Sequence, residues 1–170
     1  MITTRATLLA ALPLLATASL SAQAEVFMSD AWAKKACSAW NSNGTLTSEL
    51  GKWATNDKGR GYKTIQMYRE GCGAGSKVEL KISAKDGKAV CTYGGAVTNK
   101  MPNYGADYLM HATDEDWTCM GTGKCKAMGS MMSGKLKFQG PKMEAMGVMG
   151  PFNAFLALTG TVGGDKGSCP

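Results

Sequence analysis

The sequence lacks the motifs on which common enzyme classes depend. It contains a single histidine, His111, and has no Gly-x-Ser-x-Gly, no His-Glu-x-x-His and no phosphate-binding loop. Three adjacent carboxylates, Asp114, Glu115 and Asp116, have a simpler explanation than acid–base chemistry, because acidic residues are favoured at a helix N-terminus. We therefore predict that the protein is not an enzyme and needs no cofactor.

The sequence also lacks a dense run of basic residues. It carries 19 Lys or Arg and 13 Asp or Glu, a formal net charge of +6, with acids distributed among the lysines. Basic and aromatic residues are not interleaved as they are on many nucleic-acid-binding surfaces. The composition argues against nucleic acid as a partner, whereas its mild positive charge is compatible with an anionic membrane surface.

The N-terminus is typical of a cleavable secretory signal peptide. Arg5 supplies a positive charge, residues 6–20 form an uncharged apolar run, and Ala22-Gln23-Ala24 fits the small-x-small cleavage pattern. The run is too short to span a bilayer comfortably, which takes about 20 apolar residues. We predict that residues 1–24 are removed and that the mature protein is periplasmic or secreted.

The mature chain has an even number of cysteines, which favours up to three disulfides in an exported protein. No Cys-x-x-Cys or zinc-ligand spacing is present, so structural disulfides are favoured over redox catalysis, haem attachment or zinc. The candidates are Cys37, Cys72, Cys91, Cys119, Cys125 and Cys169. Sequence proximity weakly favours Cys119 with Cys125, a disulfide at Cys169 would pin the C-terminal end, and the pairing is otherwise open.

Hydrophobic periodicity predicts one α+β domain over residues 25–160, followed by a glycine-rich tail over 161–170. Lys85-Asp86-Gly87-Lys88 has the composition of a tight hairpin turn. The expected strands are 62–69, 78–83, 89–93, 107–112 and 135–139. The expected helices are 29–40, a short one ending at 53, 113–120, 125–132, and two that begin at 140–141 and 150–151. Helices must cover one face of such a small sheet.

Methionine is concentrated in one part of the chain, where eight of the 12 methionines lie between Met110 and Met149. Methionine is flexible and polarisable, so it suits surfaces that repack around different apolar shapes. Three interpretations are open: an ordinary core, a cavity for a lipid, and a Cu(I) site built from thioethers, thiolates and His111. The spacing follows helix and strand faces rather than a compact ligand loop, which disfavours copper.

Part of this region resembles a known family. Asp114-Glu115-Asp116-Trp117, Gly123-Lys124 and the segment Met131-Met132-Ser133-Gly134-Lys135-Leu136-Lys137-Phe138 are similar to motifs of the sterol carrier protein 2 (SCP-2) family. The register between them needs no gap, and the resemblance extends over most of residues 78–158. The chain departs from the family in its six cysteines and in Gly147, Gly150 and Pro151, which interrupt the closing helix.

The resemblance implies a five-stranded, mostly antiparallel sheet covered on one face by helices, with an apolar tunnel for sterols, fatty acids or similar lipids. It implies lipid binding or transfer without catalysis, metal or cofactor. We expect the cavity to be lined by Met132, Leu136, Phe138, Met143, Met146, Met149, Phe152 and Phe155. Cu(I) binding, or a disulfide-stabilised interaction module whose cavity has filled in, are the alternatives.

Overall fold

The computed structural model describes residues 24–170. The predicted signal peptide lies almost entirely outside these residues, so its cleavage and the export of the protein stay predictions. Within residues 24–170, no helix has both the length and the apolar character that crossing a membrane requires.

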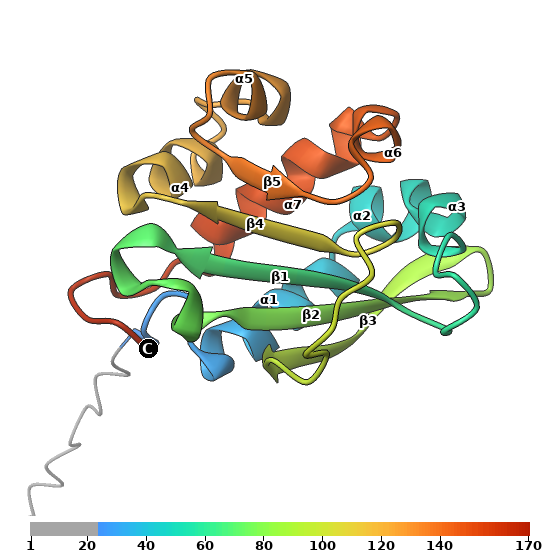
Figure 1. Cartoon of the computed structure of the whole chain (residues 1–170), viewed down its shortest axis with the longest axis horizontal. Helices are drawn as coiled ribbons and strands as arrows, with labels where there is room; N and C mark the ends of the chain where they lie inside the picture. Colours follow the sequence, from blue (N-terminus) through green and yellow to red (C-terminus); the bar gives the residue numbers. More distant parts are fainter. Residues whose placement is uncertain (1–23) are drawn as a thin grey trace, which may run out of the picture.

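A five-stranded sheet forms the centre of the molecule (Figure 1). Its strands are β1 (Lys63–Arg69), β2 (Val78–Lys85), β3 (Lys88–Ala96), β4 (Tyr108–Ala112) and β5 (Lys137–Gln139). They are ordered β3-β2-β1-β4-β5, and only the central β1–β4 pair is parallel. The predicted α+β fold with a mostly antiparallel sheet is confirmed.

The β2–β3 hairpin turns at the predicted position. Asp86 and Gly87 both have positive φ, 50° and 74°, which is the backbone conformation that matches the right-handed twist of two strands joined by a two-residue turn. The turn fixes the register in which Leu80 and Ile82 face the core, because a slip of one residue would turn both to solvent.

Helices cover one face of the sheet, with α1 and α7 lying behind it in Figure 1. Ser29 and Thr113 cap α1 and α4 by accepting hydrogen bonds from main-chain N–H groups, as their positions in the sequence suggest. The helices are α1 (Asp30–Asn41), α2 (Gly44–Glu49), α3 (Gly51–Ala54), α4 (Asp114–Gly121), α5 (Ala127–Met132), α6 (Lys142–Met146) and α7 (Met149–Val162). Two short 3₁₀ turns, Glu70–Cys72 and Ala74–Ser76, precede β2.

The C-terminal helices differ in detail from the sequence expectation. The interruption expected at Gly147 is present, since α6 ends at Met146 and α7 begins at Met149. Pro151 lies in the first turn of α7, where its missing N–H costs no helical hydrogen bond. The helix then continues to Val162, because Leu156, Leu158 and Thr159 are all buried and hold its last turns against the core.

All six cysteines are paired. Cys119 is bonded to Cys125, and Cys169 is bonded to Cys72, so the proximity argument and the expectation of a pinned tail are both confirmed. The third disulfide joins Cys37 on α1 to Cys91 on β3. The tail is also held by the guanidinium of Arg69, which donates hydrogen bonds to two carbonyl oxygens of residues 166 and 168.

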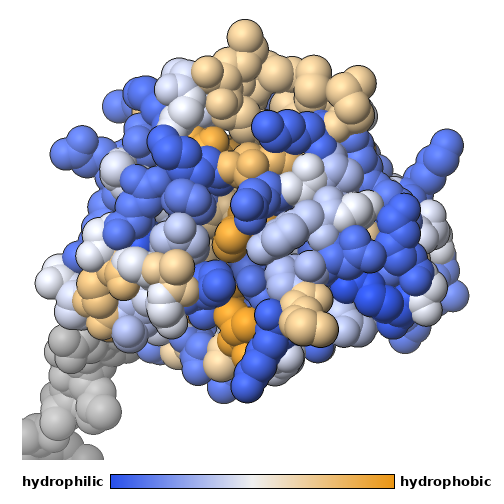
Figure 2. All heavy atoms as spheres, viewed as in Figure 1, coloured by the Kyte–Doolittle hydropathy of each residue, from blue (hydrophilic) through white to orange (hydrophobic). Residues whose placement is uncertain are grey.

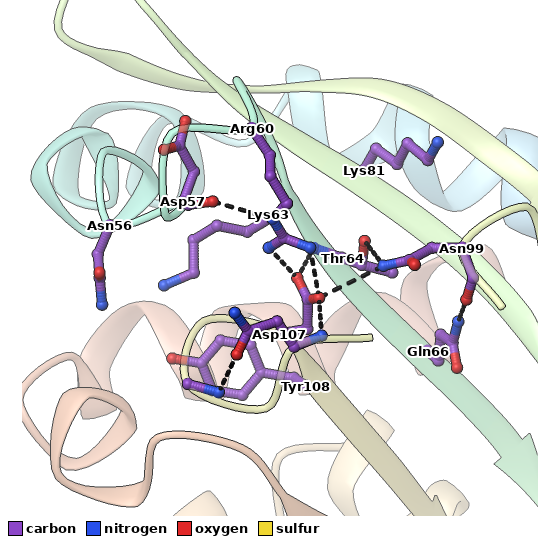
Figure 3. Close-up of polar contacts among 12 residues, drawn as sticks. Asn56, Asp57, Arg60, Lys63, Thr64, Gln66, Lys81, Asn99, Asp107 and Tyr108 are labelled. Carbon is purple, nitrogen blue, oxygen red and sulfur yellow. Dashed lines mark hydrogen bonds and ion pairs between the residues drawn. The ribbon is translucent and has the colours of Figure 1, made fainter. Parts of the chain in front are cut away.

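The loop that joins β3 to β4 crosses in front of the second face of the sheet in Figure 1, and Figure 3 shows polar contacts between this loop and β1. Asp107 is fully buried at the end of this loop and pairs with both terminal guanidinium nitrogens of Arg60 at 2.7 Å. Gln66 and Asn99 complete the polar layer, with the Gln66 amide donating to the carbonyl oxygen of Asn99. Polar groups therefore fill the face that the helices leave uncovered.

Candidate functional site: an aromatic cavity beside a methionine groove

An apolar cavity lies between the sheet and the helices. Its walls come from seven helices and strands and from the adjoining turns, and aromatic side chains form much of them. The lining residues are Trp40, Leu50, Trp53, Ile65, Tyr108, Met110, Phe138, Ala145, Val148, Phe152 and Phe155. We call this space the aromatic cavity.

The aromatic cavity is closed in this structure. Its volume is about 30 Å³, whereas pockets that hold drug-sized ligands typically offer about 300–1,000 Å³. The rings fill the space themselves: Trp40 packs edge-on against Phe155 at 5.8 Å, and Phe138 lies 5.9 Å from Phe152. A lipid chain could enter only if some of these side chains moved.

A groove of about 510 Å³ lies outside the cavity, on the surface formed by α5, β5 and α6. We call it the methionine groove. It is lined by Met128, Met131, Met132, Gly134, Leu136, Lys137, Phe138, Lys142 and Met146. Figure 2 shows apolar residues gathered at the end of the molecule where Figure 1 places α5. Phe138 lines both the groove and the cavity, so its ring forms part of the wall between them.

The elements at this wall are short. The strand β5 has three residues and pairs with β4 alone, and α6 has five residues. Gly140 joins them with φ of 142°, and a Cβ at this position would lie 2.7 Å from the carbonyl oxygen of Asp107. Short elements joined through glycine lose few interactions when they open locally, which marks this wall as the part of the cavity most able to move.

The structure separates the eight residues expected to line a cavity into three groups. Phe138, Phe152 and Phe155 line the aromatic cavity, and Met132, Leu136, Phe138 and Met146 line the methionine groove. Met143 and Met149 line neither space; the Met143 side chain is 78% exposed, whereas Met149 packs against the core. The methionines thus lie mainly at the surface, and the internal space is formed by aromatic rings.

Sequence reasoning missed the cavity residues that lie earlier in the chain than the methionine-rich segment. Trp40 and Trp53 come from α1 and α3, while Ile65 and Tyr108 come from β1 and β4. The apolar alternation of each strand predicts that Ile65 and Tyr108 face inward. Nothing in the sequence, however, predicts that these two helices and two strands meet at Phe138.

A buried polar cluster adjoins the aromatic cavity. Lys63 is fully buried, and its ammonium lies 2.6 Å from Oε2 of Glu144 and 4.2 Å from the centre of the Trp53 ring. Asn56 donates to Oε1 of Glu144 at 2.6 Å, and the Tyr108 hydroxyl donates to Oε2. In Figure 3 the ends of Asn56, Lys63 and Tyr108 converge, at the place where these contacts put the Glu144 carboxylate.

Burial controls the ionisation of this cluster. It lowers the pKa of Lys63, and the hydrogen bond that Lys63 donates to Glu144, together with the negative charge of that carboxylate, offsets only part of this effect. Burial and the hydrogen bond to Glu144 both raise the pKa of Tyr108, so its phenol stays protonated and remains a donor. The alternation of β1 places Lys63 on the same face as Ile65 and Met67, a signal that the sequence analysis did not use.

The net positive charge is concentrated in the segment that contains the methionine groove. Residues 117–162 contain five lysines but one acidic residue, Glu144, whose carboxylate is already paired with Lys63. The lysines are all exposed, and two of them line the groove. They are Lys124, Lys126, Lys135, Lys137 and Lys142. The remainder of the mature chain is close to charge balance.

The copper alternative receives no support from the side chains that the structure describes. All six cysteines are in disulfides and supply no thiolate. His111 stacks on Tyr68 with ring centres 4.5 Å apart, and its Nδ1 lies 2.9 Å from a carboxylate oxygen of Glu70. Among residues 24–170, no three His, Cys, Asp or Glu side chains come together in an arrangement that could hold a metal ion.

Comparison with known proteins identifies the family. The SCP-2 sterol transfer family matches residues 67–153, slightly more than half of the chain. The chain belongs to this family. A crystal structure of sterol carrier protein 2 is 17% identical, with a TM-score of 0.53, and the match covers 80% of this chain and 98% of that one. Sterol carrier protein domain 2 of Helicoverpa armigera is 23% identical over 77% of this chain and 89% of its own, with a TM-score of 0.44. No curated protein sequence matches significantly.

Proposed function

We propose that this SCP-2 protein binds a lipid in the aromatic cavity and carries or transfers it without catalysis. The observation that supports this proposal most directly is the shared wall at Phe138. A surface groove lined by methionines and an internal cavity lined by aromatic rings share one side chain, Phe138, on a three-residue edge strand. The membership of a sterol transfer family points in the same direction.

The physics of apolar burial allows reversible binding at such a site. Each methylene removed from water contributes about 0.8 kcal/mol, so a chain of roughly 15 carbons gives on the order of 12 kcal/mol. Association itself costs about 4–15 kcal/mol, and opening the wall at Phe138 adds to that cost. Binding that is tight enough to carry a lipid and weak enough to release it is the expected result.

The proposal is tested by recovering and rebinding a ligand. Purified protein is extracted with organic solvent, the extract is analysed by mass spectrometry, and the delipidated protein is titrated with a fluorescent fatty acid. We expect a co-purifying lipid or saturable, displaceable binding of the probe at one site. Recovery of no lipid, together with no binding of the probe, would overturn the proposal and favour an interaction module with a filled cavity, which the volume of about 30 Å³ also fits.

We also propose that the methionine groove docks on an anionic membrane, where the lipid would enter. Met132 and Met146 of the groove expose 82% and 44% of their surface, and Lys137 and Lys142 also line it. Three more exposed lysines lie in the same segment, whose one acid, Glu144, is paired with Lys63. Apolar side chains surrounded by cations are suited to a surface of anionic lipid head groups.

Sedimentation with vesicles tests the docking surface. The protein should sediment with phosphatidylglycerol vesicles more than with phosphatidylcholine vesicles, and replacing Lys137 and Lys142 by Ser should reduce that binding. Replacing Lys85 and Lys88 in the β2–β3 hairpin by Ser changes the net charge equally and serves as the control. If the two variants lose vesicle binding equally, then the net charge of the protein, and not this face, attracts the vesicles.

We further propose that the protein is exported through its predicted signal peptide. The three disulfides support export, because disulfides persist in oxidising compartments. The mass of the protein isolated from the periplasm or medium should correspond to a chain that begins at Glu25. Recovery of the full-length mass in the cytoplasm would contradict this localisation.

A further inference from the structure

The carboxylate of Glu144 is held by donors that belong to a different part of the molecule. Lys63 comes from β1 and Tyr108 from β4, two strands of the central sheet, and Asn56 comes from the turn after α3. Glu144 is contributed by α6, the five-residue helix at the wall between the cavity and the groove. Two of the three donors are therefore held by the sheet, whereas the acceptor belongs to a short helix outside it.

The same helix also closes the aromatic cavity. Ala145, next to Glu144, lines the cavity, and Phe138 lies just before α6 along the chain. Gly140 and Gly147 flank the helix. Because the closed cavity is about ten times smaller than a typical ligand pocket, a lipid chain must displace this wall. Displacement of α6 would withdraw Glu144 and leave the Lys63 ammonium buried without an anion.

We propose that Lys63, Tyr108 and Asn56 form a head-group site beside the cavity, where the carboxylate of a single-chain acid takes the place of Glu144 when α6 moves. This inference rests on the proposed lipid-binding function and adds the residues that hold the head group of the ligand. The Glu144 side chain would act in the closed protein as a substitute for the ligand carboxylate.

Charge favours an acid over a neutral lipid at this position. The Lys63 ammonium is fully buried against the rings of Trp53 and Tyr108, and a buried charge without a partner is strongly destabilising. An incoming carboxylate restores the ion pair and accepts the hydrogen bonds from Tyr108 and Asn56. A sterol or fatty alcohol has only a hydroxyl to offer and would leave the ammonium unpaired.

The test compares two ligands that share one hydrocarbon chain, palmitic acid and cetyl alcohol. Dissociation constants are measured with delipidated protein by displacement of an uncharged fluorescent lipid. We expect the wild type to bind the acid about ten-fold more tightly than the alcohol, the difference that one hydrogen bond to a charged group typically makes.

Three variants separate the roles of the charged residues. In Glu144→Gln the competing carboxylate is gone, so affinity for the acid should rise about ten-fold with a much smaller change for the alcohol. In Lys63→Met combined with Glu144→Gln no buried charge remains, and acid and alcohol should bind equally. Lys81→Met is the control, because Lys81 lies on β2 next to Glu79, 3.9 Å away, and should behave as the wild type.

The outcomes distinguish this inference from the function on which it rests. Equal affinity for acid and alcohol in the wild type and in Glu144→Gln would overturn the carboxylate assignment while lipid binding stands. If neither ligand displaces the probe, the proposed lipid-binding function is overturned, and the carboxylate assignment falls with it. An unchanged acid preference in the double variant would show that the carboxylate is bound somewhere else.

Discussion

Two regions of this sheet are built in opposite ways. In the first, which we call the stapled region and which comprises α1, β1, β2 and β3, the helix packs on β2 and β3. These two strands have eight and nine residues, and disulfides bridge positions 54 and 97 residues apart. In the second, which we call the methionine edge and which comprises α5, β5 and α6, the strand has three residues. The disulfide next to it, Cys119–Cys125, joins α4 to the turn before α5 and closes a separation of only six residues.

The contrast shows how a small domain can combine a stable fold with a cavity wall that opens locally. Long strands and long-range disulfides concentrate stability in the stapled region, which contributes Trp40, Ile65 and the donor Lys63 to the site. The methionine edge has short elements, exposed methionines and more lysines than acids, so we expect it to change conformation more easily than the stapled region. Local opening draws on the least stable elements of a fold, so the account places ligand entry at the methionine edge.

The largest expected effect comes from removing disulfides. A disulfide stabilises mainly by restricting the unfolded chain, and the restriction grows with loop length. Replacing Cys72 and Cys169 by Ser should lower the free energy of unfolding by about 4–5 kcal/mol, and replacing Cys119 and Cys125 by about 2 kcal/mol. Denaturant titration of both variants under oxidising conditions measures the difference, and equal losses would contradict the contrast between the regions.

A smaller effect is expected from single apolar side chains. Leu80 on β2 is fully buried, and Leu80→Ala should lower the free energy of unfolding by about 2–5 kcal/mol through lost burial and a new cavity. Met132→Ser, at an 82% exposed position, should change it by less than about 0.5 kcal/mol while weakening vesicle binding. A loss of stability from Met132→Ser comparable to that from Leu80→Ala would show that the methionine edge is part of the core.

The contribution of Asp107, at the junction between the two regions, to the free energy of unfolding should depend on pH. Burial alone would raise the pKa of Asp107, but hydrogen bonds from Arg60 and from the N–H groups of Thr64 and Asn103 outweigh it and lower that pKa. The unfolded carboxyl titrates near about 4, so its contribution to stability is complete above that pH and is lost as pH falls through the lower folded pKa.

Asp107→Asn tests this junction. At pH 7 it should lower the free energy of unfolding by about 3 kcal/mol, because Arg60 loses its buried partner. The difference between the variant and the wild type should shrink as pH falls below about 4, as measured by urea titration from pH 7 to pH 3. A constant difference across that range would contradict the assigned pKa shift.

The sequence predicted the fold well where local signals were strong. The strand expected at 78–83 and the Asp86-Gly87 turn depend on local geometry, and both lie where the sequence placed them. The glycine-rich tail expected from residue 161 begins slightly later, because α7 continues to Val162. Thr159 is buried in the last turns of this helix and donates to the carbonyl oxygen of Trp117.

The site was harder to predict because it depends on contacts between distant segments. The sequence located the methionine-rich segment. Composition could not show that the Met132 and Met143 side chains are exposed, or that Phe138 lines both the methionine groove and the aromatic cavity. The pairing of Lys63 with Glu144 joins residues 81 positions apart. Only the burial of Lys63 on an apolar strand face was within reach of the sequence.

The central claim is that lipid enters the aromatic cavity, and tryptophan fluorescence tests it most directly. Trp40 and Trp53 line the cavity, whereas Trp32 and Trp117 lie elsewhere, donating to the carbonyl oxygens of Gly163 and Tyr68. A variant with Trp32→Phe and Trp117→Phe retains only the cavity tryptophans, and the reciprocal variant retains only the others.

Both variants are titrated with a brominated fatty acid, whose bromine quenches tryptophan on contact. The account predicts saturable quenching of Trp40 and Trp53 and little quenching of Trp32 and Trp117. Quenching confined to Trp32 and Trp117, or binding of the fatty acid with no quenching of the cavity tryptophans, would contradict the account.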